Sequence, residues 1–143
     1  MHAALDICSL LVPRGPVLYV VDAYKERYTF RSYLDKKPFA NLVVLVDEYT
    51  ASAAELITAA LQDAGAAVVI GTNTFGKGTV QTWFPLSNKG TMKITTAEFF
   101  RRSGEKLNGI GVIPDFEVEM HYDDYETPND AAILKALEVL KRR

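Results

Sequence analysis

Ser52, Lys77 and Gln81 are the most informative polar residues of this sequence, because a serine that opens a helix and a lysine in a glycine-braced turn are the parts that a Ser/Lys hydrolase needs. Ser52 precedes an apolar segment of helical pattern, and Lys77 stands between Gly76 and Gly78. A serine hydroxyl is a weak nucleophile until a neighbouring base accepts its proton, and a lysine is that base only where burial disfavours its ammonium form. The pattern therefore predicts a Ser/Lys hydrolase in which the hydroxyl of Ser52 and the amine of Lys77 meet across a dry gap.

Each of these residues also has a structural interpretation. Ser52 and Glu55 form the Ser-x-x-Glu pattern of a capping box, in which the serine begins a helix and the glutamate reaches back to its backbone. Capping and catalysis are compatible, because a helix N-terminus offers free N–H groups, here that of Ala53, to the oxyanion of a tetrahedral intermediate. Taken alone, Lys77 is also typical of a solvated lysine in a glycine-rich turn, and Gln81 of an ordinary polar strand residue.

Residues 71–78 nearly match the phosphate-binding pattern G-x-x-x-x-G-K-[ST]. Gly78 stands, however, where a hydroxyl should bind the metal ion. The residues that follow, 79–84, are β-branched and aromatic, which favours a strand where a P-loop requires a helix. A nucleotide-binding domain is therefore the least favoured interpretation.

The composition is that of an ordinary globular domain, with 143 residues, 48% hydrophobic and 24% charged, and a net charge of −2. Lys and Arg are scattered, so we expect no nucleic-acid partner, and no apolar run reaches the length of a membrane span.

Cys8, the only cysteine, lies in an apolar helical segment and is predicted to be a buried, inert thiol. His2 and His121 have no ligating residues at useful spacing, so we predict surface histidines, no metal site and no Ser-His-Asp triad. Asp63 is predicted to be a surface acid.

Apolar periodicity and turn signals predict an α/β fold whose elements are a helix at 2–12, strands at 16–23, 28–34 and 42–46, a helix at 53–64, a strand at 67–70, a hairpin of 79–86 and 91–100, and a C-terminal helix. Residues 42–46 are apolar on both faces, which predicts a strand in the middle of a parallel sheet. For the last helix, Thr127 is the expected cap with Pro128 next, and Ile133, Leu137 and Leu140 form the expected buried stripe.

Two segments, 50–63 (TASAAELITAALQD) and 69–81 (VIGTNTFGKGTVQ), resemble the C-terminal processing, or tail-specific, serine peptidases. The match continues through residues 94–100, 103–107 and 111–115. The resemblance implies a crotonase/Clp-peptidase-like α/β sandwich with a mixed, mostly parallel sheet and flanking helices.

By the same resemblance, Ser52 is the nucleophile, Lys77 the general base, Gln81 the residue that orients the lysine, and Ala53 supplies an oxyanion-hole N–H. The family cleaves polypeptides near apolar C-terminal tails through an acyl-enzyme, without metal or cofactor. Its members are commonly periplasmic, exported or membrane-anchored in bacteria.

The family pattern also includes an upstream Arg-x-Asn-Pro-Gly-Gly stretch, which supplies a second oxyanion N–H, and a PDZ domain that binds the substrate tail. Neither is found in residues 1–143, so we expect a single partial core domain, truncated at its N-terminal side, with weak or no activity. A non-catalytic binding or scaffold module on the same fold is the alternative. A central strand missing beside residues 42–46 would leave an open edge, from which we expect self-association.

Overall fold

The computed structural model describes residues 2–35, 39–119, 123 and 127–142, so the interpretation of His121 lies outside the described residues. None of the described helices is long and apolar enough to cross a membrane. The elements follow one another as α1 (His2–Leu11), β1 (Gly15–Asp22), β2 (Arg27–Ser32), β3 (Val43–Val46), α2 (Ala53–Asp63), β4 (Val68–Gly71), β5 (Thr79–Pro85), β6 (Thr91–Arg101), β7 (Phe116–Glu117) and α3 (Ala131–Lys141).

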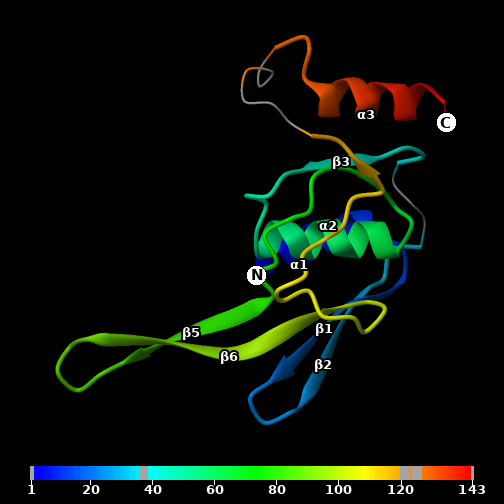
Figure 1. The fold of residues 1–143 in the computed structure, drawn as a ribbon. Helices are drawn as coiled ribbons and strands as arrows, with labels where there is room; N and C mark the ends of the chain where they lie inside the picture. The colour runs from blue at the N-terminus through cyan, green and yellow to red at the C-terminus, as the bar shows by residue number, and fades with distance from the viewer. Residues whose placement is uncertain (1, 36–38, 120–122, 124–126, 143) are drawn as a thin grey trace.

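The elements are arranged in layers, with α1 and α2 between two sheets and α3 on the far side of the smaller sheet (Figure 1). One sheet is antiparallel, in the order β2-β1-β6-β5, and the other is parallel, in the order β3-β4-β7. The expected α/β class is confirmed, and the parallel and antiparallel strands form two separate sheets. The β5–β6 hairpin extends away from the rest of the molecule.

The predicted β-α-β unit is present, because β3 and β4 pair in parallel from Val43↔Val68 to Val46↔Gly71 with α2 between them in sequence. The central position predicted for residues 42–46 is wrong. Strand β4 is central and wholly buried, whereas β3 is an edge strand whose Leu45 is 44% exposed. A strand that is apolar on both faces must be covered on both faces, but this pattern carries no information about its neighbours in the sheet. The open edge expected beside residues 42–46 is thus present.

The main core lies where α1 and α2 pack against the antiparallel sheet. Cys8 of α1 and Val12, which directly follows this helix, are fully buried there, with Leu56 and Leu61 of α2 and Phe99 of β6 in the same cluster. The predicted burial of Cys8 is confirmed, and desolvation raises the pKa of its thiol from 9.0 to about 11. A thiol that stays protonated at neutral pH is a poor nucleophile, as expected.

Helix α3 begins later than its sequence predicts. Asp130 is its N-cap and accepts the N–H of Ile133 at 3.0 Å, so the expected cap at Thr127 is wrong. Both sites carry residues that favour caps, and the sequence offered no means of choosing between two candidates three residues apart.

The buried stripe predicted for α3 is also wrong. Ile133, Leu137 and Leu140 are exposed, and the residues that pack against Val68 and Ile70 of the parallel sheet are smaller, namely Ala132, Ala136 and Val139. The helix has apolar residues on two faces. Small side chains allow the closer approach to a sheet, so the residues with the larger apolar area remain outside.

Candidate active site

Ser52 occupies a strained turn at the start of α2. Its backbone has φ 59° and ψ −115°, a conformation that a residue with a side chain rarely adopts, and it is the N-cap of the helix. Such strain costs on the order of 1–3 kcal/mol and tends to occur at functional sites. The predicted helix start at Ser52 is confirmed, and the sharp turn is one that the capping pattern does not require.

The buried carboxylate of Glu55 connects this turn to the loop that carries Lys77. Its Oε2 accepts the backbone N–H of Ser52 at 2.7 Å and that of Lys77 at 2.8 Å. Its Oε1 accepts the N–H of Gly76 and the hydroxyl of Thr74, both at 2.6 Å. Glu55 is 0% exposed, so these four donors replace water around both oxygens.

The sequence pattern predicts Glu55 only as a helix-capping residue, and its bond to the N–H of Ser52 confirms that role. Its contacts with the loop at residues 74–77 were missed. A signal was available, because Glu55 is an acidic residue on a helix predicted to be buried around most of its circumference. A buried carboxylate needs several donors, and a glycine-rich loop with free N–H groups is a suitable source of them.

Two glycines allow the loop to adopt the required path. Gly76 has φ +84°, which places its N–H towards Glu55, and its C=O accepts the N–H of Gly109 at 2.8 Å. Gly78 lies so close to the neighbouring segment that an added Cβ would stand 2.4 Å from the backbone nitrogen of Asn108. The loop is thereby held between α2 on one side and residues 108–109 on the other.

A pocket of about 190 Å³ opens beside Ser52, and it is lined by Ser52, Ala53, Leu56, Thr79, Val80, Gln81 and Phe99. The structure therefore brings two predicted site residues, Ser52 and Gln81, to one cavity. Lys77 is exposed and does not line this pocket. Within the described residues no hydrogen bond joins Gln81 to Lys77, and the meeting of the Ser52 hydroxyl with the Lys77 amine across a dry gap stays a prediction.

The N–H of Ala53 is the first of helix α2 and has no acceptor in the described part of the chain. It points from the positive end of the helix dipole, next to the hydroxyl-bearing Ser52. An arrangement of this kind stabilises negative charge on an oxygen bound beside the helix terminus.

The P-loop interpretation is contradicted by the element that follows the glycine loop. Residues Thr79–Pro85, which follow the glycine loop, form β5, a strand of the antiparallel sheet, where a P-loop has a helix. A phosphate cradle of the P-loop type requires that helix. The nucleotide-binding alternative is therefore dismissed.

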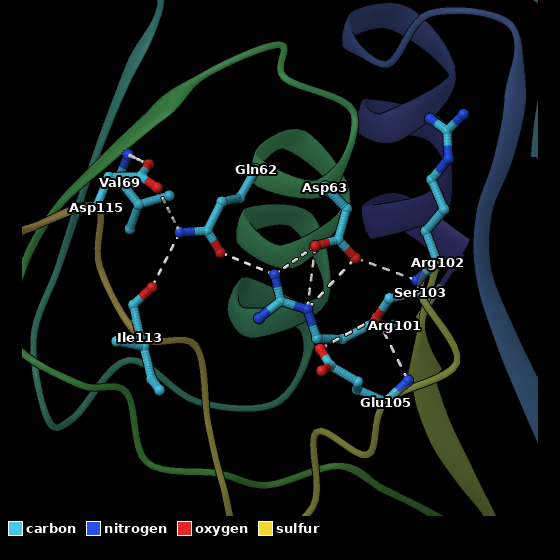
Figure 2. Close-up of polar contacts among 9 residues, drawn as sticks. All are labelled: Gln62, Asp63, Val69, Arg101, Arg102, Ser103, Glu105, Ile113 and Asp115. Carbon is cyan, nitrogen blue, oxygen red and sulfur yellow. Dashed lines mark hydrogen bonds and ion pairs between the residues drawn. The ribbon is translucent and has the colours of Figure 1, made fainter.

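Asp63 is not the surface acid predicted from the sequence. At the C-terminal end of α2 it forms an ion pair with Arg101, whose side chain is 15% exposed against 12% for Asp63. Figure 2 shows the Arg101 guanidinium between Asp63 and Gln62, and the Arg102 N–H also donates to Asp63 at 3.2 Å. The prediction was wrong because a partner 38 residues away in the chain decides the burial of this carboxylate.

Gln62 extends the same network to the parallel sheet. Its Nε2 donates to the carbonyl of Ile113 at 2.9 Å and to Asp115 at 3.1 Å, and Asp115 in turn accepts the N–H of Val69 at 2.8 Å (Figure 2). The C-terminal end of α2 is thus bonded to the end of β6 and to the segment before β7, and it is linked to β4 through Asp115. Glu55 holds the N-terminal end of α2, so polar contacts fix the helix at both ends.

A model of one protein family, Peptidase family S41, matches residues 1–118, from α1 to β7. The chain belongs to this serine peptidase family. The S41 relatives include the carboxyl-terminal-processing protease of Synechocystis sp., 32% identical over 143 residues, which cover 98% of this chain and 34% of the relative. Another is the carboxy-terminal-processing protease of Bartonella bacilliformis, 46% identical over 85 residues, or 59% of this chain and 19% of the relative. The S41 chain thus spans well under half the length of these relatives.

Solved structures agree with this assignment to S41. The photosystem II D1 C-terminal processing protease superposes with a TM-score of 0.76 at 33% identity, over 82% of this chain and 31% of that one. The tricorn protease, at 22% identity and a TM-score of 0.65 over 98% of this chain and 14% of that one, shows the fold alone. The family resemblance predicted from residues 50–63 and 69–81 is confirmed. The individual roles of Ser52, Lys77, Gln81 and Ala53 stay predictions.

Proposed function

We propose that this chain is the catalytic core of an endopeptidase that cleaves polypeptides near apolar C-terminal tails through an acyl-enzyme. The observation that carries the proposal is the shared anchor at Glu55, which ties the strained turn of Ser52 to the loop of Lys77. A cap alone needs neither the strain at Ser52 nor a link to a glycine-braced lysine. Membership of S41 supplies the peptidase class, and the relatives are named as C-terminal processing proteases.

In the proposed reaction, Ser52 Oγ attacks the scissile carbonyl carbon while the neutral amine of Lys77 takes the hydroxyl proton. The N–H of Ala53 donates to the oxyanion that forms. As the intermediate collapses, the C–N bond breaks and the leaving amine receives the proton from Lys77. Water then attacks the acyl carbon while Lys77 accepts its proton. The bond between the acyl carbon and Ser52 Oγ breaks, Oγ takes the proton back from Lys77, and the new carboxyl terminus leaves.

Lys77 must lose its proton for this reaction, and the residue is exposed in the isolated chain. We propose that the polypeptide itself covers the lysine when it occupies the pocket beside Ser52. Gln81, at the rim of the same pocket, would then orient the amine. The pocket is lined by uncharged residues only, which suits an apolar substrate side chain.

Labelling with a fluorophosphonate tests the nucleophile directly. We expect covalent labelling of the chain, its loss in Ser52→Ala, and slower labelling in Lys77→Ala, because the reagent reacts with an activated serine. Ser103→Ala, which changes an exposed serine away from the pocket, serves as the control and should label as the unchanged chain does. Labelling that persists in Ser52→Ala would refute the assignment, and its absence throughout would favour the non-catalytic binding or scaffold module.

The open edge of β3 supports a second proposal, that two copies of the chain associate there. Leu45 is exposed on this edge strand, and unpaired strand edges pair readily with other strands. Light scattering at micromolar concentration should then detect dimers or larger species, and Leu45→Lys should reduce them. A monodisperse monomer would contradict this proposal.

A further inference from the structure

Strand β5 ends the antiparallel sheet, and its pairing with β6 fixes the direction of each of its backbone groups. β6 is its only partner strand in the described structure. At one end the N–H of Phe99 donates to the C=O of Gly78 at 2.7 Å, and at the other the N–H of Leu86 donates to the C=O of Gly90 at 2.8 Å. Gly78 and Leu86 therefore direct their backbone groups towards β6.

Backbone direction alternates along a strand, so the residues between these two points can be assigned. Counting from either end, Val80 and Thr82 face β6, whereas Thr79, Gln81 and Trp83 direct their N–H and C=O groups away from it. The two counts agree although the strand pairing is irregular between Val80 and Gln81. At that point the partner residues change from Ala97 to Thr95, so the extra residue belongs to β6 and the alternation along β5 is not interrupted.

Pro85 provides an independent check on this parity. A proline lacks the N–H that a sheet ladder uses, so in an edge strand it belongs at a position that faces away from the partner strand. Pro85, opposite Thr91, is at such an outward position by the same count. The free polar edge therefore extends from Thr79 to Trp83 and ends at the proline.

This open edge passes directly beside the candidate nucleophile. Thr79 and Gln81, two of the three outward-facing residues, line the same pocket as Ser52. The rest of that lining is apolar, from Ala53, Leu56, Val80 and Phe99. A chain lying along β5 would thus have both a backbone partner and a hollow for one apolar side chain.

We propose that an extended polypeptide binds as an added strand on the open edge of β5, pairing with the backbone of Thr79, Gln81 and Trp83. Backbone pairing selects an extended conformation and not a sequence, whereas the pocket beside Ser52 selects one uncharged, apolar side chain. The strand carries no lysine and only a terminal proline, so it has little of the protection that exposed edges usually have. That this bound chain is the one cleaved rests on the proposed function.

The test uses the Ser52→Ala chain, which cannot cleave, and the peptide acetyl-Thr-Val-Thr-Leu-Ser-Val-amide as probe. Amide hydrogen exchange is followed residue by residue by NMR, with and without saturating peptide. We expect the N–H groups of Gln81 and Trp83 to exchange at least about tenfold more slowly with peptide, and those of Val80 and Thr82, already bonded to β6, to change far less. No slowing, or equal slowing at all four, would overturn the proposal.

A series of peptides, each N-methylated at one position, provides a second measurement that does not depend on protein variants. Methylation of amides that face β5 should weaken binding by about fivefold to tenfold each, and methylation of the amides between them should not. Affinity that lacks this alternation would contradict an added strand. Pairing of two β5 edges from two copies would instead appear as slow exchange of the Gln81 and Trp83 N–H groups without peptide, in a dimer that Leu45→Lys does not reduce, and would likewise contradict the proposal.

On the protein side, Trp83→Pro removes one outward N–H and should weaken peptide binding beyond the effect of Trp83→Ala, which removes the same side chain. The matched control is Thr29→Pro on β2, the opposite edge of the sheet. The N–H of Asp22 donates to the C=O of Glu26 at 3.0 Å, so Glu26 faces β1. Backbone direction alternates from there along β2, which makes Thr29 an outward-facing residue. Equal binding by Trp83→Pro and Trp83→Ala would count against the proposal.

The two proposals fail separately. Fluorophosphonate labelling of Ser52 needs no added strand, so labelling without peptide protection overturns this inference and leaves the peptidase standing. Alternating protection of the β5 amides by peptide, without fluorophosphonate labelling of Ser52, supports the added strand and refutes the proposed hydrolase activity.

Discussion

The buried carboxylate of Glu55 accepts the backbone N–H of Lys77 at 2.8 Å, through the same oxygen that accepts the N–H of Ser52 at 2.7 Å. The candidate base and the candidate nucleophile are thus positioned by one side chain. Because both contacts are made to backbone, they fix the path of the chain at each residue and leave the hydroxyl and the amine free to react.

Replacement of Glu55 by glutamine tests this anchor. An amide keeps the shape, but its NH2 group would face N–H donors that then lose their acceptor. We expect Glu55→Gln to lower the free energy of unfolding by about 3 kcal/mol, measured by urea denaturation, and to slow fluorophosphonate labelling of Ser52. The control is Glu48→Gln, an exposed glutamate that accepts the hydroxyl of Thr72 at 3.2 Å, which should change stability by less than about 0.5 kcal/mol. Similar losses in the two variants would contradict the anchor.

The ion pair of Asp63 and Arg101 offers a second test, because it is mostly buried. Asp63→Asn leaves the guanidinium without its full anionic partner and should lower the free energy of unfolding by about 3 kcal/mol. The matched variant is Asp35→Asn, which breaks the ion pair between Asp35 and Arg14. The side chain of Arg14 is 61% exposed and that of Asp35 is 76% exposed, so the loss of this pair should lower the free energy of unfolding by less than about 1 kcal/mol. Equal costs in thermal or urea unfolding would show that the Asp63 pair is not stabilising α2.

The strain at Ser52 predicts an unusual order of stabilities. Ser52→Gly and Ser52→Ala both remove the hydroxyl, but only glycine adopts φ 59° without steric cost, so the glycine variant should be more stable by about 1 kcal/mol. At Ser9, inside α1, the order should reverse, with alanine more stable by about 1 kcal/mol. Melting temperatures of the four variants decide the matter, and a more stable alanine at position 52 would disprove the strain.

The buried thiol of Cys8 predicts a loss of stability at alkaline pH. Its pKa is about 11 in the folded chain, against an ordinary value of 9.0, so the unfolded chain releases this proton first. The stabilising effect is complete below about pH 9 and disappears as the pH rises through about 11. Urea midpoints of the unchanged chain should therefore fall more between pH 8.5 and 10.5 than those of Cys8→Ala. Parallel pH profiles would refute the raised pKa.

Much of the fold followed from local patterns. The helix that begins at Ser52, the strands on either side of it, the β5–β6 hairpin and the burial of Cys8 depend on periodicity, capping and turn residues within short segments, and the structure confirms each of them. Errors arose where a choice between distant partners was needed. The edge position of β3 and the small-residue face of α3 depend on what packs against them.

The sequence by itself determined which elements form and which family they belong to, because hydrophobic period, capping residues and ordered motifs are local properties of the chain. Only the tertiary structure decided that Glu55 joins Ser52 to the lysine loop, that Asp63 is paired, that Lys77 is exposed, and which backbone groups of β5 face outward. These relationships depend on residues about 20 to 40 positions apart, whose distances are set by packing and strand register.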